Sequence, residues 1–162
     1  MARHAFFSFH YQNDIWRASQ VRNAWVTQDR DTAGFWDAAD WEKVKRGGES
    51  AIERWIENQL DGTSVTVVLI GSQTAERKFV KYEVRRSHEL GKGLLGVRIH
   101  KLKDRNGVTS SAGENPFDSF YVDTNGRRKY LSEIYPVYDW VANDGYENFA
   151  DWIEKAARDA GR

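Results

Sequence analysis

One carboxylate lies on the apolar stripe of a predicted helix, where it could take part in chemistry. Val80 and Val84 recur at helical spacing, and Glu83 falls between them on the same face. An unpaired buried charge is costly, so such a glutamate pairs with a cation, lines a cleft or keeps its head in water. Two interpretations follow: a rim glutamate beside Arg86 or Arg77, or an inward ionisable group at a functional cleft.

The elements that must position this glutamate are those of an α/β sheet. Strands are expected at residues 5–9, 34–37, 64–70, 94–99 and 136–140, and helices at about 14–27, 50–60 and 77–90. A capping box of Ser50 and Glu53 and an N-cap at Asn13 or Asp14 would begin two of these helices. Successive strand–helix–strand units predict a flavodoxin-like parallel sheet of about five strands, in the order 2-1-3-4-5, with helices on both faces.

The expected sheet also locates the binding cleft. Ligands of open α/β sheets bind beyond the carboxyl ends of the strands, where the strand order reverses. Here that point lies between the first and third strands, beside the start of the helix that carries Glu83. We therefore expect Ser8, His10 and Ser72 to contact a ligand.

The rest of the chain belongs to the same domain, residues 1–162. Residues 101–135 are polar and form an elaborated connection with room for a hairpin, because they carry the turn signals Asn106-Gly107, Asn115-Pro116 and Asn125-Gly126. Asn143-Asp144 is expected to cap a C-terminal helix at about 145–159.

Composition excludes several classes of function. The 162 residues include 24 Lys and Arg and 24 Asp and Glu, so no net charge attracts nucleic acid or an acidic membrane. There is no cysteine, which removes disulfides, thiolate metal sites and a cysteine nucleophile. The apolar run at 65–70 is too short to span a bilayer, and the apolar residues 5–7 are too few for a signal peptide. We expect a cytoplasmic protein that binds neither nucleic acid nor membrane.

Familiar cofactor and metal motifs are missing or misplaced in the sequence. Residues 91–96 match G-x-G-x-x-G, but they follow a helix and enter a strand, the reverse of the dinucleotide-binding order. The sequence contains no P-loop string, and its four histidines lack metal-ligand spacing. We therefore expect no metal and no bound cofactor.

Four segments resemble TIR domains. Residues 6–9, Phe-Phe-Ser-Phe, look like the first-strand signature, 35–37 like the second strand and 67–72 like the third. Residues 79–83 fall where NAD-cleaving TIR domains carry a tryptophan, three residues and the catalytic glutamate. Residues 6–12, 64–74, 115–118 and 137–146 resemble, more narrowly, the ThsB family of TIR-like proteins from the bacterial Thoeris antiphage system.

The resemblance implies a defence enzyme that responds to phage infection. Such an enzyme cleaves NAD and forms a cyclic ADP-ribose isomer that activates a separate effector, ThsA, and NAD is its substrate rather than a cofactor. Glu83 takes the catalytic position. The residues implied to contact NAD are Ser8, Phe9, His10, Asp37, Trp41, Ser72 and Phe79.

A second class of function stays open. TIR-like domains also serve as non-catalytic adaptors that act by self-association or partner binding, and Phe79 stands where the NAD-cleaving enzymes carry tryptophan. Phe79 keeps an aromatic face but lacks the indole donor. Residues 38–49 are expected to form a polar loop, containing Trp41 and a Gly47-Gly48 hinge, that acts as a lid or an assembly contact.

Overall fold

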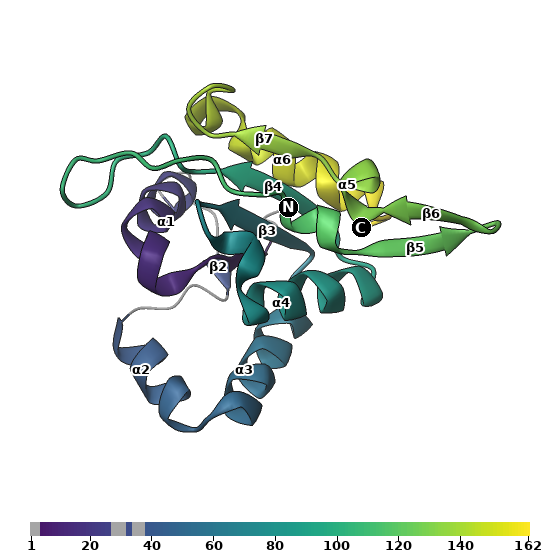
Figure 1. Ribbon diagram of the computed structural model, residues 1–162, viewed down its shortest axis with the longest axis horizontal. Coiled ribbons are helices and arrows are strands. Elements are labelled where there is room, and N and C mark those ends of the chain that lie inside the picture. The colour runs from purple at the N-terminus through teal and green to yellow at the C-terminus, as the bar shows by residue number, and fades with distance from the viewer. Residues whose placement is uncertain (1–3, 27–31, 34–37) are drawn as a thin grey trace.

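Five short strands form one parallel sheet in the computed structural model, which describes residues 4–26, 32–33 and 38–162 (Figure 1). The strands are β1 (Ala5–Ser8), β2 (Thr32–Ala33), β3 (Val65–Ile70), β4 (Gly93–Arg98) and β7 (Val137–Asp139). Their order is β2-β1-β3-β4-β7, and each neighbouring pair is parallel. This confirms the predicted α/β architecture and its strand order. The second strand was expected at 34–37, which lies outside the described residues.

Two helices cover one face of the sheet. These are α1 (Tyr11–Val26) and α6 (Gly145–Asp159), the second of which matches the expected C-terminal helix. Phe7, Val67 and Leu95 project from the strands into one apolar cluster with Trp25 and Phe149 from these helices. Burial of each such side chain stabilises the fold by about 1.5–3 kcal/mol. The two helices thus fix the far side of the sheet.

The opposite face carries α3 (Glu49–Asp61) and α4 (Lys78–Glu89). Phe6 of β1 packs under α3 against Ile52 and Ile56. Val80 of α4 packs onto the neighbouring strand β3 in a second cluster on this face. α3 and α4 contact each other, and α4 also contacts β1 and β3 (Figure 1).

The segment expected to be a polar loop is helical over most of its length. It forms α2 (Ala38–Arg46), which contacts α3. The prediction was wrong because charged residues were taken as a sign of a loop, whereas Ala, Glu, Lys and Arg all favour helix. Gly47-Gly48 separates α2 from α3, and Gly48 has a φ of 83°, a conformation that favours glycine.

Two expected helix caps are absent, and a third lies at an expected residue without a side-chain hydrogen bond. α3 begins at Glu49 after Gly48 without a side-chain cap, so Ser50 and Glu53 do not form a capping box there. α1 begins at Tyr11, and Asp14 is buried within its first turns instead of capping it. Asp144 is the N-cap residue of α6, but its side chain makes no cap hydrogen bond.

The connection between β4 and β7 contains the hairpin that its turn signals allow. It comprises η2 (Pro116–Ser119), β5 (Tyr121–Thr124), β6 (Arg127–Tyr130) and α5 (Leu131–Ile134). Asn125 and Gly126 have φ angles of 53° and 81°, as the tight turn of a two-residue hairpin requires. The hairpin extends away from the sheet (Figure 1). No helix in the described ranges is long and apolar enough to cross a membrane.

Candidate active site

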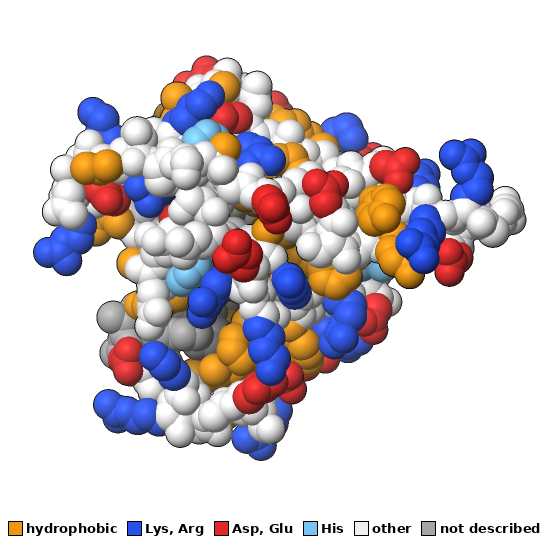
Figure 2. Space-filling model, viewed as in Figure 1, with side chains coloured by type: hydrophobic (Ala, Val, Ile, Leu, Met, Phe, Trp, Pro, Cys, Tyr) orange, Lys and Arg blue, Asp and Glu red, His pale blue; other side chains and the backbone are white. Residues whose placement is uncertain are grey.

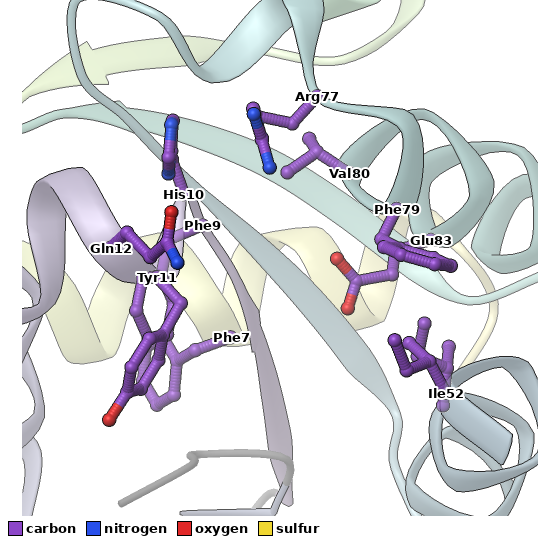
Figure 3. Close-up of a pocket in the computed structure, with 11 residues that line it drawn as sticks. Phe7, Phe9, His10, Tyr11, Gln12, Ile52, Arg77, Phe79, Val80 and Glu83 are labelled. Carbon is purple, nitrogen blue, oxygen red and sulfur yellow. The ribbon is translucent and has the colours of Figure 1, made fainter. Parts of the chain in front are cut away.

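A small cavity lies where β1 ends beneath α3 and α4 (Figure 3). Its walls come from the end of β1, the start of α1, α3 and the amino half of α4, and comprise Phe7, Phe9, His10, Tyr11, Gln12, Ile52, Ile56, Arg77, Phe79, Val80 and Glu83. It is at the sheet edge predicted for a ligand. Its volume is about 50 Å³, far below the roughly 300–1,000 Å³ of sites that hold small molecules.

Glu83 is the acidic residue of the cavity wall. Its side chain is 5% exposed and its carboxylate points into the cavity (Figure 3). The Ser8 hydroxyl donates a hydrogen bond to Glu83 Oε1 over 2.8 Å, and both side chains are buried. Arg86, one of the two cations expected beside it, instead binds Glu57 and Glu89. The interpretation as a rim glutamate paired with a cation is therefore wrong.

The environment of Glu83 favours its protonated form. Burial raises the pKa of Glu83 from 4.5 to about 8, and the Ser8 hydrogen bond offsets part of this rise. Across the described residues no salt bridge compensates its charge. A buried carboxyl with a strongly raised pKa in a cavity is typical of functional sites.

A second buried polar pair holds α4 in place. Thr66 of β3 and Ser87 of α4 share a hydrogen bond of 2.7 Å between their hydroxyls. Ser87 lies one turn beyond Glu83 on the same face of the helix. Ser8 and Thr66 lie on neighbouring strands, so two side-chain bonds fix the rotation of α4 above β1 and β3.

The far border of the cavity is cationic. Arg77 lies directly before α4 with an exposed side chain, and His10 follows β1. Their side chains lie on the same side of the cavity, across from Glu83 (Figure 3). Burial and the positive charge of Arg77 lower the pKa of His10, which keeps its imidazole neutral at pH 7.

Beside the cavity, Asp14 and Arg17 anchor the neighbouring loops. Arg17 Nη1 lies 3.3 Å from Asp14 Oδ1, and Arg17 also donates to the backbone oxygens of Leu102 and Val108 at 2.8 Å each. A Cβ atom at Gly71 would collide with the Asp14 carboxylate. The loop after β3 therefore reaches its position only because residue 71 is glycine.

The structure brings together five of the residues predicted to form the site and separates one from them. Phe9, His10, Phe79 and Glu83 line the cavity, and Ser8 binds Glu83 directly. Ser72 is outside the cavity wall and meets Asn13 at 3.5 Å. Asp37 and the side chain of Trp41 lie outside the described residues.

Sequence reasoning missed most of the cavity wall, including Ile52, Ile56, Tyr11 and Arg77. The isoleucines carry an ordinary core pattern, and only the docking of α3 on β1 brings them to the cavity. Arg77 occupies the N-cap position of α4, where Ser, Thr, Asp or Asn is usual. This unusual residue type is the local signal that could have identified it.

The surface and the metal-ligand geometry point away from other kinds of site. Figure 2 shows Lys and Arg side chains interspersed with Asp and Glu over the visible face, without the extended basic patch that nucleic acid needs. No three His, Asp or Glu side chains converge in a metal-binding arrangement within the described part of the chain.

Comparison with known proteins decides the family. The family model "Thoeris protein ThsB, TIR-like domain" matches residues 6–104, more than half of the chain. The chain belongs to the ThsB family. A relative from Bacillus cereus (strain MSX-D12), named "Putative cyclic ADP-D-ribose synthase ThsB1", is 38% identical over 191 aligned residues, which cover 94% of this chain and 100% of the relative.

The ThsB match includes the whole candidate site. It begins at Phe6 in β1 and ends at Asp104, just beyond β4, so every residue that lines the cavity lies within it. The resemblance to TIR-like proteins of the Thoeris system is confirmed. The elements after β4, including the hairpin and α6, lie beyond the matched family model.

Proposed function

We propose that this ThsB-family protein cleaves the bond between nicotinamide and ribose in NAD and closes the remaining ADP-ribose into a cyclic isomer. The observation that carries the proposal is the buried Glu83 carboxyl, held by Ser8 in a cavity at the carboxyl end of β1. The printed name of the Bacillus relative supports the same product class. NAD is the substrate, and no bound cofactor takes part.

The first step breaks the bond from ribose C1′ to the nicotinamide nitrogen. The bonding electrons leave with nicotinamide, which becomes neutral and needs no general acid. Positive charge develops on the ribose, and the Glu83 carboxylate stabilises it across a water-poor cavity. The nicotinamide ring of bound NAD is itself a cation, so its arrival favours the ionised form of Glu83 despite the raised pKa of the free site.

The second step joins the ADP-ribose to itself. A hydroxyl or ring nitrogen of the same molecule attacks C1′ and forms the new bond. The proton that leaves to solvent comes from the hydroxyl itself or, for a ring nitrogen, from the amino group conjugated with it. Water would instead give linear ADP-ribose, so cyclisation requires a cavity that excludes it. The apolar walls Ile52, Phe79 and Val80 supply such an environment beside Glu83.

The cavity must enlarge before NAD can enter. Its volume of about 50 Å³ holds only a few waters. α3 and α4 form adjoining walls, so a shift of α3 away from α4, with α2 attached, opens the site. We propose that infection, through a phage-derived trigger or self-association, favours the open form, and that the cyclic product then reaches a ThsA-type effector in the cytoplasm.

The closed cavity also supports an alternative, a non-catalytic adaptor. Chromatography with mass spectrometry separates the two functions, using lysates of cells with and without phage and the purified protein incubated with NAD. An enzyme yields nicotinamide and a product lighter than ADP-ribose by one water, and Glu83→Gln abolishes both. An adaptor leaves NAD unchanged in every sample, which would overturn the proposal.

A further inference from the structure

Arg77 presents an uncommitted positive charge at the border of the cavity. Its backbone N–H donates to Thr74 O at 3.1 Å and closes the short helix η1 (Thr74–Glu76), which fixes the residue where α4 begins. The guanidinium is exposed and lines the cavity. Within the described ranges it forms no salt bridge, and the Glu83 carboxylate is beyond ion-pair distance. This charge is therefore available to a ligand.

The amino end of α4 also borders the cavity, beside Arg77. No side chain caps it, and its first intrahelical bond is donated by Lys81 N to Arg77 O. The backbone N–H groups of the first turn, at residues 78–80, thus have no partner within the helix. Phe79 and Val80 of this turn line the cavity. Free N–H groups and the helix dipole favour an anion at such an end.

His10 gives an independent indication of a ligand. Its side chain is 8% exposed and lines the cavity. Its Nδ1 accepts the backbone N–H of Asn13 at 3.4 Å, and this bond assigns the ring proton of the neutral imidazole to Nε2. That N–H has no hydrogen-bond partner among the described residues. The ring is nine-tenths buried in the cavity wall, so this N–H can donate to an acceptor on a ligand in the cavity.

We infer that His10, Arg77 and the amino end of α4 form a binding site for the diphosphate of the dinucleotide substrate. This inference rests on the proposed function and adds the orientation of NAD. The donors lie on one border of the cavity and Glu83 on another (Figure 3). Arg77 precedes Glu83 by six residues, about 9 Å along the helix axis. The diphosphate joins the reactive ribose through C5′, so one sugar ring bridges the two groups.

This orientation predicts which substrates the site distinguishes. Nicotinamide riboside carries the scissile bond but no phosphate, so it can meet Glu83 without engaging Arg77. NAD can meet Glu83 with its reactive ribose and Arg77 with its diphosphate. The contribution of Arg77 therefore appears with NAD and disappears with the riboside, whereas a general disturbance of α4 would affect both equally.

The kinetic test compares Arg77→Gln with Lys81→Gln, a matched control on the same helix whose exposed side chain does not line the cavity. Loss of a charge-assisted contact is expected to lower kcat/KM for NAD by about 10- to 100-fold in Arg77→Gln. The value for nicotinamide riboside should stay at the wild-type level, and Lys81→Gln should match wild type with both. Equal losses for the two substrates, or no loss with NAD, overturn the inference.

A binding test separates this inference from the proposed function, because it needs no chemistry. Calorimetry with inorganic pyrophosphate should show binding to the wild type, Lys81→Gln and Glu83→Gln, and at least about tenfold weaker binding to Arg77→Gln. His10→Phe keeps the ring volume without the N–H and should also weaken binding. No binding to the wild type, or equal binding to Arg77→Gln, overturns the diphosphate site. Arg77-dependent binding of pyrophosphate without NAD cleavage would contradict the proposed function but not the diphosphate site.

Discussion

The Arg86 guanidinium of α4 holds the Glu57 carboxylate of α3 through Nε, at 2.8 Å from one oxygen and 3.3 Å from the other. Lys78 and Glu49 make a second ion pair between the same helices. The two pairs tie α3 to α4 at both ends of their contact. These helices form adjoining walls of the cavity, so both pairs favour its closed form.

Removing one of these ion pairs should raise the activity of the purified protein in the absence of phage. Arg86→Gln removes a partly exposed ion pair worth less than about 1 kcal/mol, which allows up to about a fivefold gain in the open population. We expect faster NAD turnover by the purified protein and a small fall in melting temperature. Arg85→Gln removes the Arg85–Glu89 pair and the contact of Arg85 with the Tyr82 ring, both within α4, and is the control. A slower Arg86→Gln enzyme would contradict the role given to α3.

If Glu83 is catalytic as proposed, replacing its carboxyl should abolish chemistry and spare the fold. Glu83→Gln keeps the size of the side chain and can still accept the Ser8 hydrogen bond, but it cannot stabilise positive charge on the ribose. We expect at least about a 100-fold loss of product with no loss of melting temperature. Glu76→Gln changes an exposed glutamate outside the cavity and should behave as wild type. Wild-type product levels from Glu83→Gln would show that another residue is catalytic.

Activity should depend on pH through Glu83. The ionised form reacts and its pKa is about 8, so kcat/KM should rise with pH up to about 8 and then level off. Ser8→Ala removes the hydrogen bond that lowers this pKa, so its profile should move to higher pH. Ser87→Ala is a matched control, since it breaks a buried hydroxyl pair on the same helix without touching Glu83. Profiles that coincide for all three proteins would contradict this assignment.

The same titration affects stability with a defined sign. The carboxyl binds its proton more tightly in the folded state, with a pKa of about 8 against 4.5 ordinarily. The wild type should therefore lose stability as pH rises from about 4.5 to 8, by an amount on the order of a few kcal/mol. Glu83→Gln lacks this loss, so its advantage in melting temperature should grow across that range. A constant difference between the two proteins would exclude a raised pKa.

Phe79 is expected to support substrate stacking. It lines the cavity four residues before Glu83, on the same side of α4. Phe79→Ala should reduce product formation by about 2- to 10-fold, whereas Phe79→Trp should keep or raise it. Tyr82→Ala is the control, since Tyr82 packs against the same apolar cluster but lies outside the cavity wall. Phe79→Ala and Tyr82→Ala could instead lose the same amount of product formation, in proportion to their falls in melting temperature. That result would show that Phe79 only packs in the core.

The close approach of Gly71 to Asp14 should make residue 71 intolerant of a side chain. Gly71→Ala forces the loop after β3 away from a buried carboxylate, at a cost of about 1–3 kcal/mol in the free energy of unfolding. Gly62→Ala is a matched control, because a methyl group there meets no atom within 4 Å. Denaturant unfolding measures both variants. A Gly71→Ala protein as stable as Gly62→Ala would show that the loop can relax without loss.

The sequence allowed most of the sheet to be predicted, because its signals are local. The β-branched run of β3 and the stripe of α4 each specify one element, and crossover rules then restrict the strand order. α2 was missed because a short charged helix resembles a loop when its packing partner is unknown. Glu83 and Ser8 were found because each sits on a regular pattern. Ile52 was not, because its place in the cavity depends on how α3 docks on β1.

The order of elements along the chain has a consequence for biosynthesis. All 11 residues that line the cavity occur by residue 83, whereas α6, which supplies Phe149 and Ile153 to the core, ends the chain. A ribosome therefore exposes the reactive residues long before the far face of the sheet is covered. If the proposed function holds, we expect a chain stopped at Asp144 to cleave no NAD despite containing the whole cavity wall, so that the cell's dinucleotide pool stays intact until α6 has been made and packed.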